Sequence, residues 1–314
     1  MITEVNGLIS KYEKITILTH LNPDADTIGT ALGIYGILKN SGKQVEVVNQ
    51  GINLPRHLDF LPYFSKIKNQ IDYSNSLIIT CDTGSIDRVG FKLSGREILN
   101  IDHHKSNTNF GTINVVDSLA VSASEVAYGL FKNNYLMTKE VSICFYTALV
   151  ADTQYFSTNN VSKKVFTLAS EMIADGVNIY EVMCNVKQRR SLASVRILAS
   201  SLDTLLLDKN GSLSIMYATK KKMLESGADI IDTVGIVDYG ISLVTVDIAI
   251  FLIELESSVR VSIRSKNVDV STLAIGFGGG GHKNAAGFEV ENISKDELLK
   301  MIKKEIKKLG LLDA

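Results

Sequence analysis

Residues 15–41 read ITILTHLNPDADTIGTALGIYGILKNS, and this stretch decides the fold of the first half of the chain. Its β-branched opening, Ile15–Thr19, predicts a strand. Apolar residues then recur at intervals of three and four positions and predict a helix that ends at the Ser41-Gly42 pair; they are Ile28, Ala31, Leu32, Tyr35 and Leu38. A strand followed by a helix is the repeating unit of a parallel sheet.

The rest of the first half continues this alternation. Strands are predicted at 45–48, 77–80 and 98–101, and helices at 121–133, 139–150 and 162–175. A long helical pattern occupies 177–207. Further strands are predicted at 213–218, 243–255 and 260–265, followed by a Gly-rich segment and a helix that begins at the capping sequence Ser294–Glu297.

These patterns predict an α/β protein of two domains. Residues 1–185 form a parallel-sheet domain with flanking helices, 186–207 a helical connector and 208–314 a smaller α+β domain. We expect a cleft between the two domains.

Composition excludes several classes of function. The 33 Lys and Arg residues nearly cancel the 34 Asp and Glu residues, so the net charge of −1 provides no field for holding duplex DNA. Cys81, Cys144 and Cys184 are widely spaced and indicate neither a disulfide framework nor a zinc site. No apolar run reaches the roughly 18 residues of a membrane span, so we expect a cytoplasmic protein that does not contact membranes.

Acidic and histidine side chains gather where the predicted strands end. The clusters contain His20, Asp24 and Asp26 after the first strand, Asp82 after 77–80, Asp102, His103 and His104 after 98–101, and Asp152 at the end of a helix. Ligands bind at the carboxyl ends of strands in open α/β sheets. One such cluster is a weak signal, but four in one sheet predict a metal site, because buried charge must be paired or must coordinate metal. Imidazole and carboxylate donors favour Mn²⁺ or a similar octahedral ion.

The motifs HLNPDAD, CDTG, IDHH and ADT, in this order, resemble those of the DHH phosphoesterase family over roughly residues 12–155. In the second half, VSIRSK at 261–266, VDVS at 268–271 and GGGGHKNAAG at 278–287 resemble the associated DHHA1 domain. The resemblance therefore covers most of the chain.

The resemblance implies two divalent metal ions. His20, Asp24 and Asp82 would hold one ion; Asp26, Asp82, His103 and Asp152 would hold the other. Asp82 would bridge them. His104 would face the substrate, and Asp102 would orient an imidazole. Two such ions would activate a water for attack on phosphorus, so no Ser or Cys nucleophile is needed.

The Gly-rich segment predicts a phosphate-binding site in the second domain. Consecutive glycines let backbone N–H groups approach an anion, and an arginine fork suits a phosphate. The predicted substrate-binding residues are Arg264, Ser265, Gly279, Gly280, Gly281 and His282.

Within the family, the two-domain form resembles nanoRNases that also remove the 3′-phosphate of 3′-phosphoadenosine 5′-phosphate. In both reactions the bond that is cut lies on the 3′-oxygen of a nucleotide with a 5′-phosphate, so one site could serve both. The expected partners are short single-stranded RNA or small nucleotides, and a homodimer is left open.

Hydrolysis of linear pApA or cyclic di-AMP is an alternative that the motifs do not separate from this activity. Family II pyrophosphatase ranks lower, because a basic signature replaces the Gly-rich segment in that group. A nucleotide-binding regulator without activity also ranks lower, because every expected ligand is present. Oligonucleotide length, base preference and the physiological metal stay open.

Overall fold

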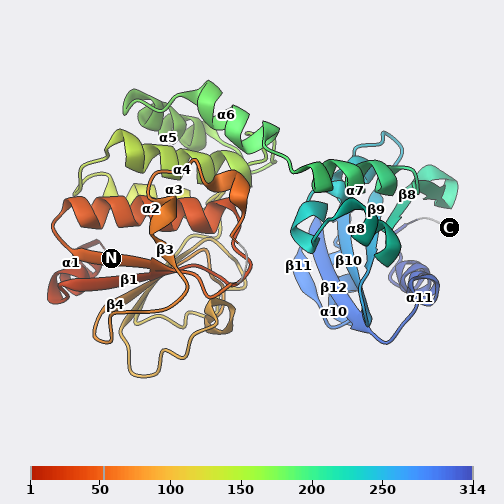
Figure 1. The fold of residues 1–314 in the computed structure, drawn as a ribbon, viewed down its shortest axis with the longest axis horizontal. Coiled ribbons are helices and arrows are strands. Elements are labelled where there is room, and N and C mark those ends of the chain that lie inside the picture. Colours follow the sequence, from red (N-terminus) through yellow and green to blue (C-terminus); the bar gives the residue numbers. More distant parts are fainter. Residues whose placement is uncertain (1, 52–53, 313–314) are drawn as a thin grey trace. The chain divides into compact units, whose positions relative to one another are not determined.

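The computed structural model describes residues 2–51 and 54–312, and it divides the chain into two compact units, Met1–Arg189 and Arg190–Ala314 (Figure 1). The chain passes from the first unit to the second at Arg189–Arg190. The predicted helical pattern over 177–207 corresponds to two helices, α6 (Ile179–Gln188) and α7 (Leu192–Leu202). They are separate because Ser191 caps α7 by accepting the N–H of Ser194 at 2.9 Å.

The first unit contains a six-stranded, entirely parallel sheet in the order β3-β2-β1-β4-β5-β6. Its strands are β1 (Lys14–Leu18), β2 (Gln44–Val48), β3 (Ile67–Lys68), β4 (Leu77–Cys81), β5 (Ile98–Asp102) and β6 (Ile113–Val116). The predicted α/β class is confirmed. The short edge strands β3 and β6 were not predicted.

Helices cover one face of this sheet, as Figure 1 shows. They are α1 (Ile2–Lys11), α2 (Ala25–Asn40), α3 (Ala123–Phe131), α4 (Lys139–Asp152), α5 (Lys163–Ala174) and α6. Helices α5 and α6 pack against α4 in an outer layer. The other face packs a smaller cluster that includes Leu18, Ile78 and Val89. Val89 belongs to the short 3₁₀ helix η3 (Ile86–Val89); two others are η1 (Arg56–Leu58) and η2 (Phe64–Lys66).

Helices α2 and α4 pack unusually closely because α2 presents glycines to α4. A Cβ on Gly29 would lie 2.6 Å from the carbonyl oxygen of Cys144, and one on Gly33 would lie 2.7 Å from the Phe145 ring. A Cβ on Gly29 would also lie 2.9 Å from that of Ala148, and one on Gly36 would lie 2.7 Å from the Val141 side chain. Later positions on α2 therefore meet earlier positions on α4, so the helices are antiparallel. The first turn of α2 therefore lies beside the last turn of α4.

The second unit contains a six-stranded sheet in the order β11-β12-β10-β9-β8-β7, in which only the β8–β9 pair is parallel. The strands are β7 (Leu206–Asp208), β8 (Leu213–Ala218), β9 (Ile248–Glu254), β10 (Ser258–Ser265), β11 (Gly280–His282) and β12 (Ala285–Glu291). The strand predicted at 243–255 begins later, because Lys266 Nζ binds the carbonyls of Leu243 and Val244 and holds them in a loop.

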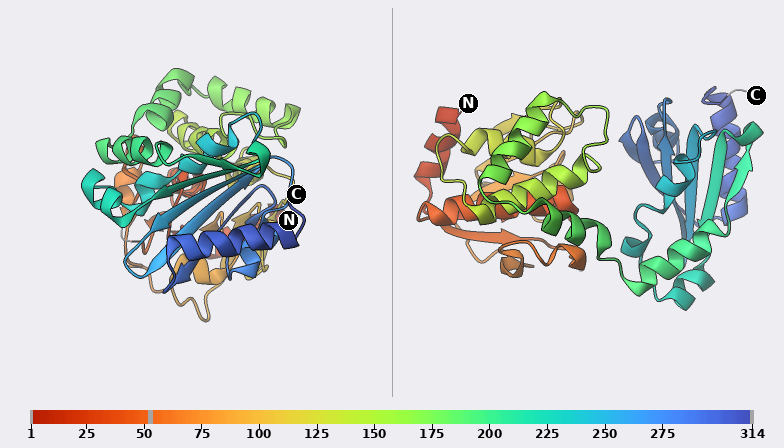
Figure 2. Two further views of the ribbon diagram at one scale, coloured as in Figure 1. Left: turned by 90° about the vertical axis from the view of Figure 1, so that its right-hand side faces the viewer. Right: turned by 90° about the horizontal axis from the view of Figure 1, so that it is seen from above.

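Helices pack on both faces of this second sheet. One face packs against α10 (Ser271–Gly276) and α11 (Lys295–Lys308), as Figure 2 shows for α11. The other packs against α7, α8 (Lys220–Ser226) and α9 (Ile236–Ile241). The remaining turns are η4 (Lys209–Gly211) and η5 (Ile230–Thr233). No helix among the described residues has the length and apolar character needed to cross a membrane.

Candidate metal centre

The predicted acidic and histidine clusters meet at the carboxyl edge of the first sheet. His20 follows β1, Asp82 follows β4, and Asp102 ends β5, directly before His103 and His104. Strands β1, β4 and β5 are neighbours in the sheet. The strand order also reverses its direction beside β1: the chain runs outward from β1 through β2 to β3 and then crosses to β4 on the other side of β1. Such a switch point leaves room for a ligand.

Helices α2 and α4 bring three more carboxylates to this edge. Asp24 caps the N-terminus of α2 by accepting the N–H groups of Asp26 and Thr27 at 3.0 and 3.1 Å. Asp152 is the last residue of α4. The antiparallel packing of the two helices places Asp152 beside the start of α2.

The ligand atoms of these residues form three groups, in each of which they lie within 4.8 Å of one another. The groups are His20, Asp24 and Asp82; Asp26, His103 and Asp152; and Asp82, His103 and His104. Around His20, Nε2 lies 3.5 Å from Asp82 Oδ2 and 3.8 Å from Asp24 Oδ2. Around His103, Nε2 lies 3.4 Å from Asp82 Oδ1 and 3.6 Å from Asp152 Oδ2. All four separations exceed the usual length of an N–H···O hydrogen bond.

Three observations test whether these residues fit a cation. Asp82 is 3% exposed, and its Oδ1 atom has no hydrogen-bond partner among the described residues. A buried acceptor in this state costs free energy that a bound cation would remove. Four carboxylates also share the site with two imidazoles at its centre, which leaves negative charge. The donor set fits a divalent cation with oxygen and nitrogen ligands.

The pKa shifts in the site show the same excess of negative charge. Burial raises the pKa of Asp152 to about 7, and burial together with the charges of Asp82 and Asp152 raises the pKa of Asp26. Burial lowers the pKa of His103, but the contact with Asp82 and the charges of Asp26 and Asp152 outweigh it and raise this pKa to about 10. A cation that binds here must displace the protons that these raised pKa values favour.

Asp26 is held by the N-terminus of α3. Its Oδ2 atom accepts the N–H of Ala123 at 2.7 Å, and its Oδ1 atom accepts the N–H of Ser124 at 3.1 Å and the hydroxyl of Thr30 at 3.1 Å. The positive end of the α3 dipole stabilises the carboxylate. Sequence reasoning missed this support. The Ser122-x-x-Glu125 capping signature at the start of α3 was the available signal.

Asp102 and His104 form a second arrangement beside the cluster. Asp102 is fully buried, and its Oδ1 atom lies 2.7 Å from Nδ1 of His104 and accepts the N–H of His103 at 2.8 Å. The hydrogen bond with Asp102 raises the pKa of His104. The contact fixes the plane of the His104 ring through its Nδ1 atom.

The residues predicted to bind substrate in the second unit lie on neighbouring strands. Arg264 on β10 pairs with Ala285 on β12, and Ala285 pairs with His282 on β11. Residues in one such row project from the same face of a sheet. Arg264 Nε lies 3.0 Å from Asp238 Oδ1, and the Ser265 hydroxyl donates to the carbonyl of Val268 at 2.5 Å.

The Gly-rich segment, for which no strand was predicted, is partly a strand. Residues Gly280–His282 form β11 at the edge of the sheet. Cβ atoms on Gly279 and Gly281 would lie 2.3 Å from the carbonyl oxygen of Gly287 and 2.4 Å from that of Ala285. Close packing against β12 therefore requires glycine at these two positions.

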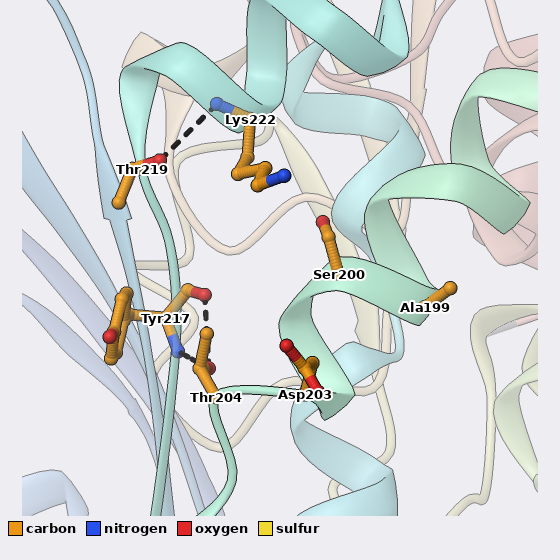
Figure 3. A pocket seen from close by; sticks show the side chains of 7 residues that line it. All are labelled: Ala199, Ser200, Asp203, Thr204, Tyr217, Thr219 and Lys222. Carbon is orange, nitrogen blue, oxygen red and sulfur yellow. Dashed lines mark hydrogen bonds between the residues drawn. The ribbon is translucent and has the colours of Figure 1, made fainter.

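A groove of about 510 Å³ lies elsewhere in the second unit, beside the edge of β8 (Figure 3). Its lining consists of Ala199, Ser200, Asp203, Thr204, Tyr217, Thr219 and Lys222. Thr204 closes one end by bonding both the N–H and the carbonyl of Tyr217. The lining differs from the predicted substrate-binding residues.

The parallel sheet with its acidic and histidine edge defines a protein of the DHH class. The family model for the DHH family N-terminal domain matches residues 14–151, and that for the DHHA1 domain matches residues 213–308. The chain belongs to the DHH phosphoesterase family, with an associated DHHA1 domain.

Several relatives match nearly the whole chain. The bifunctional oligoribonuclease and PAP phosphatase NrnA of Thermus thermophilus is 31% identical over 307 residues, which cover 95% of this chain and 92% of that protein. The protein of the same name from Bacillus subtilis is 28% identical and covers 92% of this chain and 93% of its own length.

A solved structure has the same fold. An exopolyphosphatase-related protein from Bacteroides fragilis superposes with a TM-score of 0.91 at 24% identity, covering 98% of this chain and 96% of its own.

Proposed function

We propose that this protein is a phosphoesterase with two divalent metal ions, Mn²⁺ by preference, that hydrolyses short RNA oligonucleotides to 5′-mononucleotides. We propose that it also removes the 3′-phosphate of 3′-phosphoadenosine 5′-phosphate. The observation that carries this proposal is the position of Asp82 within two of the three ligand groups. The names of the relatives from Thermus thermophilus and Bacillus subtilis support the choice of substrates.

His20, Asp24 and Asp82 would hold one ion, and Asp26, Asp82, His103 and Asp152 the other. The two ions would supply an activated water and neutralise charge on the phosphoryl group. The support for this division is geometric. The first set forms one ligand group, and His103 lies within 3.8 Å of each of the other three carboxylates of the second set.

His104 would act on the substrate. Asp102 holds its Nδ1 atom at 2.7 Å, so the Nε2 atom is the one that can transfer a proton. We propose that His104 protonates the 3′-oxygen as the bond to phosphorus breaks. This oxygen is the leaving group both in an oligonucleotide and in 3′-phosphoadenosine 5′-phosphate, so one proton donor serves both reactions.

The second unit would bind the 5′-phosphate of the nucleotide that leaves. Arg264 and His282 project from the same face of the sheet, separated by the β12 strand, and together with the β11 backbone they would contact the phosphate. Ser265 and Gly279–Gly281 would shape this surface. Free thiols at Cys81, Cys144 and Cys184 and substrates derived from RNA degradation support a cytoplasmic enzyme.

A substrate panel tests this function. The purified protein is incubated with Mn²⁺ and, in turn, with oligoribonucleotides of two to five residues, 3′-phosphoadenosine 5′-phosphate, cyclic di-AMP and inorganic pyrophosphate. We expect the first two classes to be hydrolysed fastest, and activity to stop on addition of EDTA. Preferential hydrolysis of cyclic di-AMP or pyrophosphate would replace the proposed substrates. Absence of hydrolysis of every compound would refute the enzymatic proposal.

A further inference from the structure

Asn107, in the loop that follows His104, binds the carboxylate that orients His104. Its Nδ2 atom donates to Asp102 Oδ2 at 2.5 Å. The other carboxylate oxygen of Asp102 binds His104 Nδ1 and the N–H of His103. Asp102 therefore lies between Asn107 on one side and the two histidines on the other.

Asn107 is itself held from the neighbouring strands. Its Nδ2 atom also lies 2.8 Å from Asn100 Oδ1 and 3.3 Å from the carbonyl oxygen of Thr83. Asn100, a fully buried residue of β5, donates in turn to Thr80 Oγ1 on β4 at 2.9 Å and to the Thr83 carbonyl at 3.1 Å. This chain of bonds connects the position of the Asp102 carboxylate to the parallel sheet.

A carboxylate can rotate about its last side-chain bond, and this rotation would move the oxygen that faces His104. The bond from Asn107 opposes the rotation because it engages the second oxygen. We propose that Asn107 is a positioning residue that holds Asp102 in the orientation in which it fixes the His104 ring. The inference rests on the proposed function, because the role of His104 in turnover is assigned there.

A merely structural role for Asn107 makes a different prediction. Its Oδ1 atom accepts the N–H of Asn109 at 2.7 Å and so closes a turn of the same loop. If only this turn mattered, substitution would lower stability without acting through His104. The experiment therefore needs a measurement that depends on His104.

The test compares Asn107→Ala and Asn107→Asp with the control Asn134→Asp, which makes the same change at an exposed site at the end of α3. Turnover of pApA is measured with saturating Mn²⁺. We expect both Asn107 variants to lower kcat by about 10- to 100-fold, the usual effect of removing an outer hydrogen-bond partner. KM and the Mn²⁺ affinity measured by calorimetry should stay within about threefold of wild type.

The kcat of Asn107→Asp should fall at least as far as that of Asn107→Ala, because the new side chain places a second carboxylate against Asp102. Asn134→Asp should match wild type.

A double-mutant cycle with His104→Ala separates positioning from structure. If Asn107 acts through His104, Asn107→Ala should change kcat by less than about twofold in the His104→Ala background. A full additive loss in that background, or loss of Mn²⁺ binding by Asn107→Ala, would overturn the proposal. If Asn107→Ala does not fold, Asn107→Ser, which retains a short polar side chain, takes its place in the cycle.

Crystal structures of wild type and Asn107→Ala give a readout that needs no substrate. We expect the Asp102–His104 hydrogen bond to be lost or the His104 ring to rotate in the variant. An unchanged ring and bond would overturn the positioning role even if the enzyme proved inactive on RNA. Absence of turnover by wild type on all substrates would instead refute the proposed function and leave the structural test standing.

Discussion

The two units differ in whether the charged side chains of their candidate sites already have partners. In the first unit, Nε2 of His20 and Nε2 of His103 lie 3.5 and 3.4 Å from the Asp82 carboxylate. The Oδ1 atom of Asp82 has no hydrogen-bond partner among the described residues. In the second, Arg264 already lies 3.0 Å from Asp238. The first arrangement suits a cation without further change, whereas Arg264 would have to leave Asp238 before it could bind the proposed phosphate. If the proposed function holds, metal binding uses ligands that already lie together, and phosphate binding must compete with an ion pair.

The backbones of the two units show why this contrast arises. The carboxyl ends of parallel strands deliver side chains from β1, β4 and β5 to one edge. The second sheet is largely antiparallel, so neighbouring chain ends alternate, and Arg264 and His282 are aligned only through Ala285 on the strand between them. The groups of His and Asp that could hold a metal ion all lie in the first unit, and the described residues of the second unit form none.

The largest effect is expected from Asp82, which lies in two of the three ligand groups of the first unit. If substitution of Asp82 left turnover unchanged, the contrast between the two units would be wrong. Asp82 has a φ of 54°, and Asn adopts this conformation more readily than Ala, so Asp82→Asn removes the charge with little backbone strain. We expect kcat/KM for pApA to fall by more than about 1,000-fold, beyond the roughly 10- to 100-fold of an outer partner. Circular dichroism should show an intact fold. Asp296→Asn, at an exposed site on α11, is the control. Turnover near that of wild type with saturating Mn²⁺ would exclude Asp82 as a shared ligand.

Two adjacent histidines of the first unit are predicted to have different roles, one as a metal ligand and one as a proton donor. His103 faces three carboxylates, whereas His104 is bound through Nδ1 to Asp102. His103→Ala should abolish stoichiometric Mn²⁺ binding in calorimetry. His104→Ala should bind Mn²⁺ within about threefold of wild type yet lose about 100-fold or more in kcat, the contribution of a positioned proton donor.

His57→Ala supplies the matched control, because His57 lies in η1 outside the cluster. It should retain metal and turnover. Equal loss of Mn²⁺ from His103→Ala and His104→Ala would mean that both imidazoles are ligands and that the division of roles is wrong.

A smaller effect on kcat/KM is expected at Arg264, where Asp238 and the proposed 5′-phosphate would compete for the guanidinium group. A charge-assisted contact to a 5′-phosphate contributes about 1.5–3 kcal/mol, which corresponds to roughly a tenfold to hundredfold preference for pApA over ApA. Arg264→Ala should remove most of this preference by slowing pApA alone. Asp238→Asn should do the opposite and lower KM for pApA, since it releases Arg264 from its ion pair.

Measurement of kcat/KM for both dinucleotides with all three proteins decides the matter. If wild type shows no preference, or if Arg264→Ala retains it, the 5′-phosphate is bound elsewhere. An unchanged KM in Asp238→Asn would mean that the ion pair does not compete with substrate.

The raised pKa values of Asp152 and His103 predict that metal binding depends on pH. The pKa of Asp152 is raised to about 7 and that of His103 to about 10, so the metal-free folded chain binds protons that the unfolded chain releases. The stability contributed by these groups is present at low pH and is lost as pH rises, between about 4 and 7 for Asp152 and about 6.5 and 10 for His103. Asp82, whose pKa is lowered, acts in the opposite sense below about pH 4.

A cation replaces these protons, so Mn²⁺ affinity should rise with pH by up to about tenfold per unit for each proton displaced. Thermal unfolding with EDTA and with Mn²⁺, at pH 6 and at pH 8.5, measures the effect. The gap between the two melting temperatures should widen at pH 8.5. A gap that does not change with pH would show that these groups are already deprotonated without metal.

The same contrast explains what sequence alone could predict. Strands β1, β2, β4 and β5 are short segments rich in Ile, Val and Leu. The rule that ligands meet at the carboxyl ends of parallel strands predicts that His20, Asp82 and His103 lie at one edge. The support of Asp26 by the α3 N-terminus and of Asp102 by Asn107 depends on contacts between distant segments, which periodicity does not report. Strand β11 was missed because glycine disfavours strands and only packing against β12 specifies it.

Adjacent glycines of β11 give the smallest and most local test. Gly281 has a φ of 146°, and a Cβ at this position would lie 2.5 Å from Ala286 Cα. Gly281→Ala should therefore lower the free energy of unfolding by about 1–3 kcal/mol.

A Cβ on Gly280 meets no described atom within 4 Å. The free energy of unfolding of Gly280→Ala should therefore lie within about 0.5 kcal/mol of the wild-type value. If the β11 backbone contacts a phosphate, however, the added methyl group should raise KM for pApA by about fivefold, equivalent to roughly 1 kcal/mol. Gly276→Ala, equally unobstructed but on α10, is the control for both measurements. An unchanged KM in Gly280→Ala would remove β11 from the phosphate site, while the stability of Gly281→Ala would still report whether close packing against β12 is what requires glycine there.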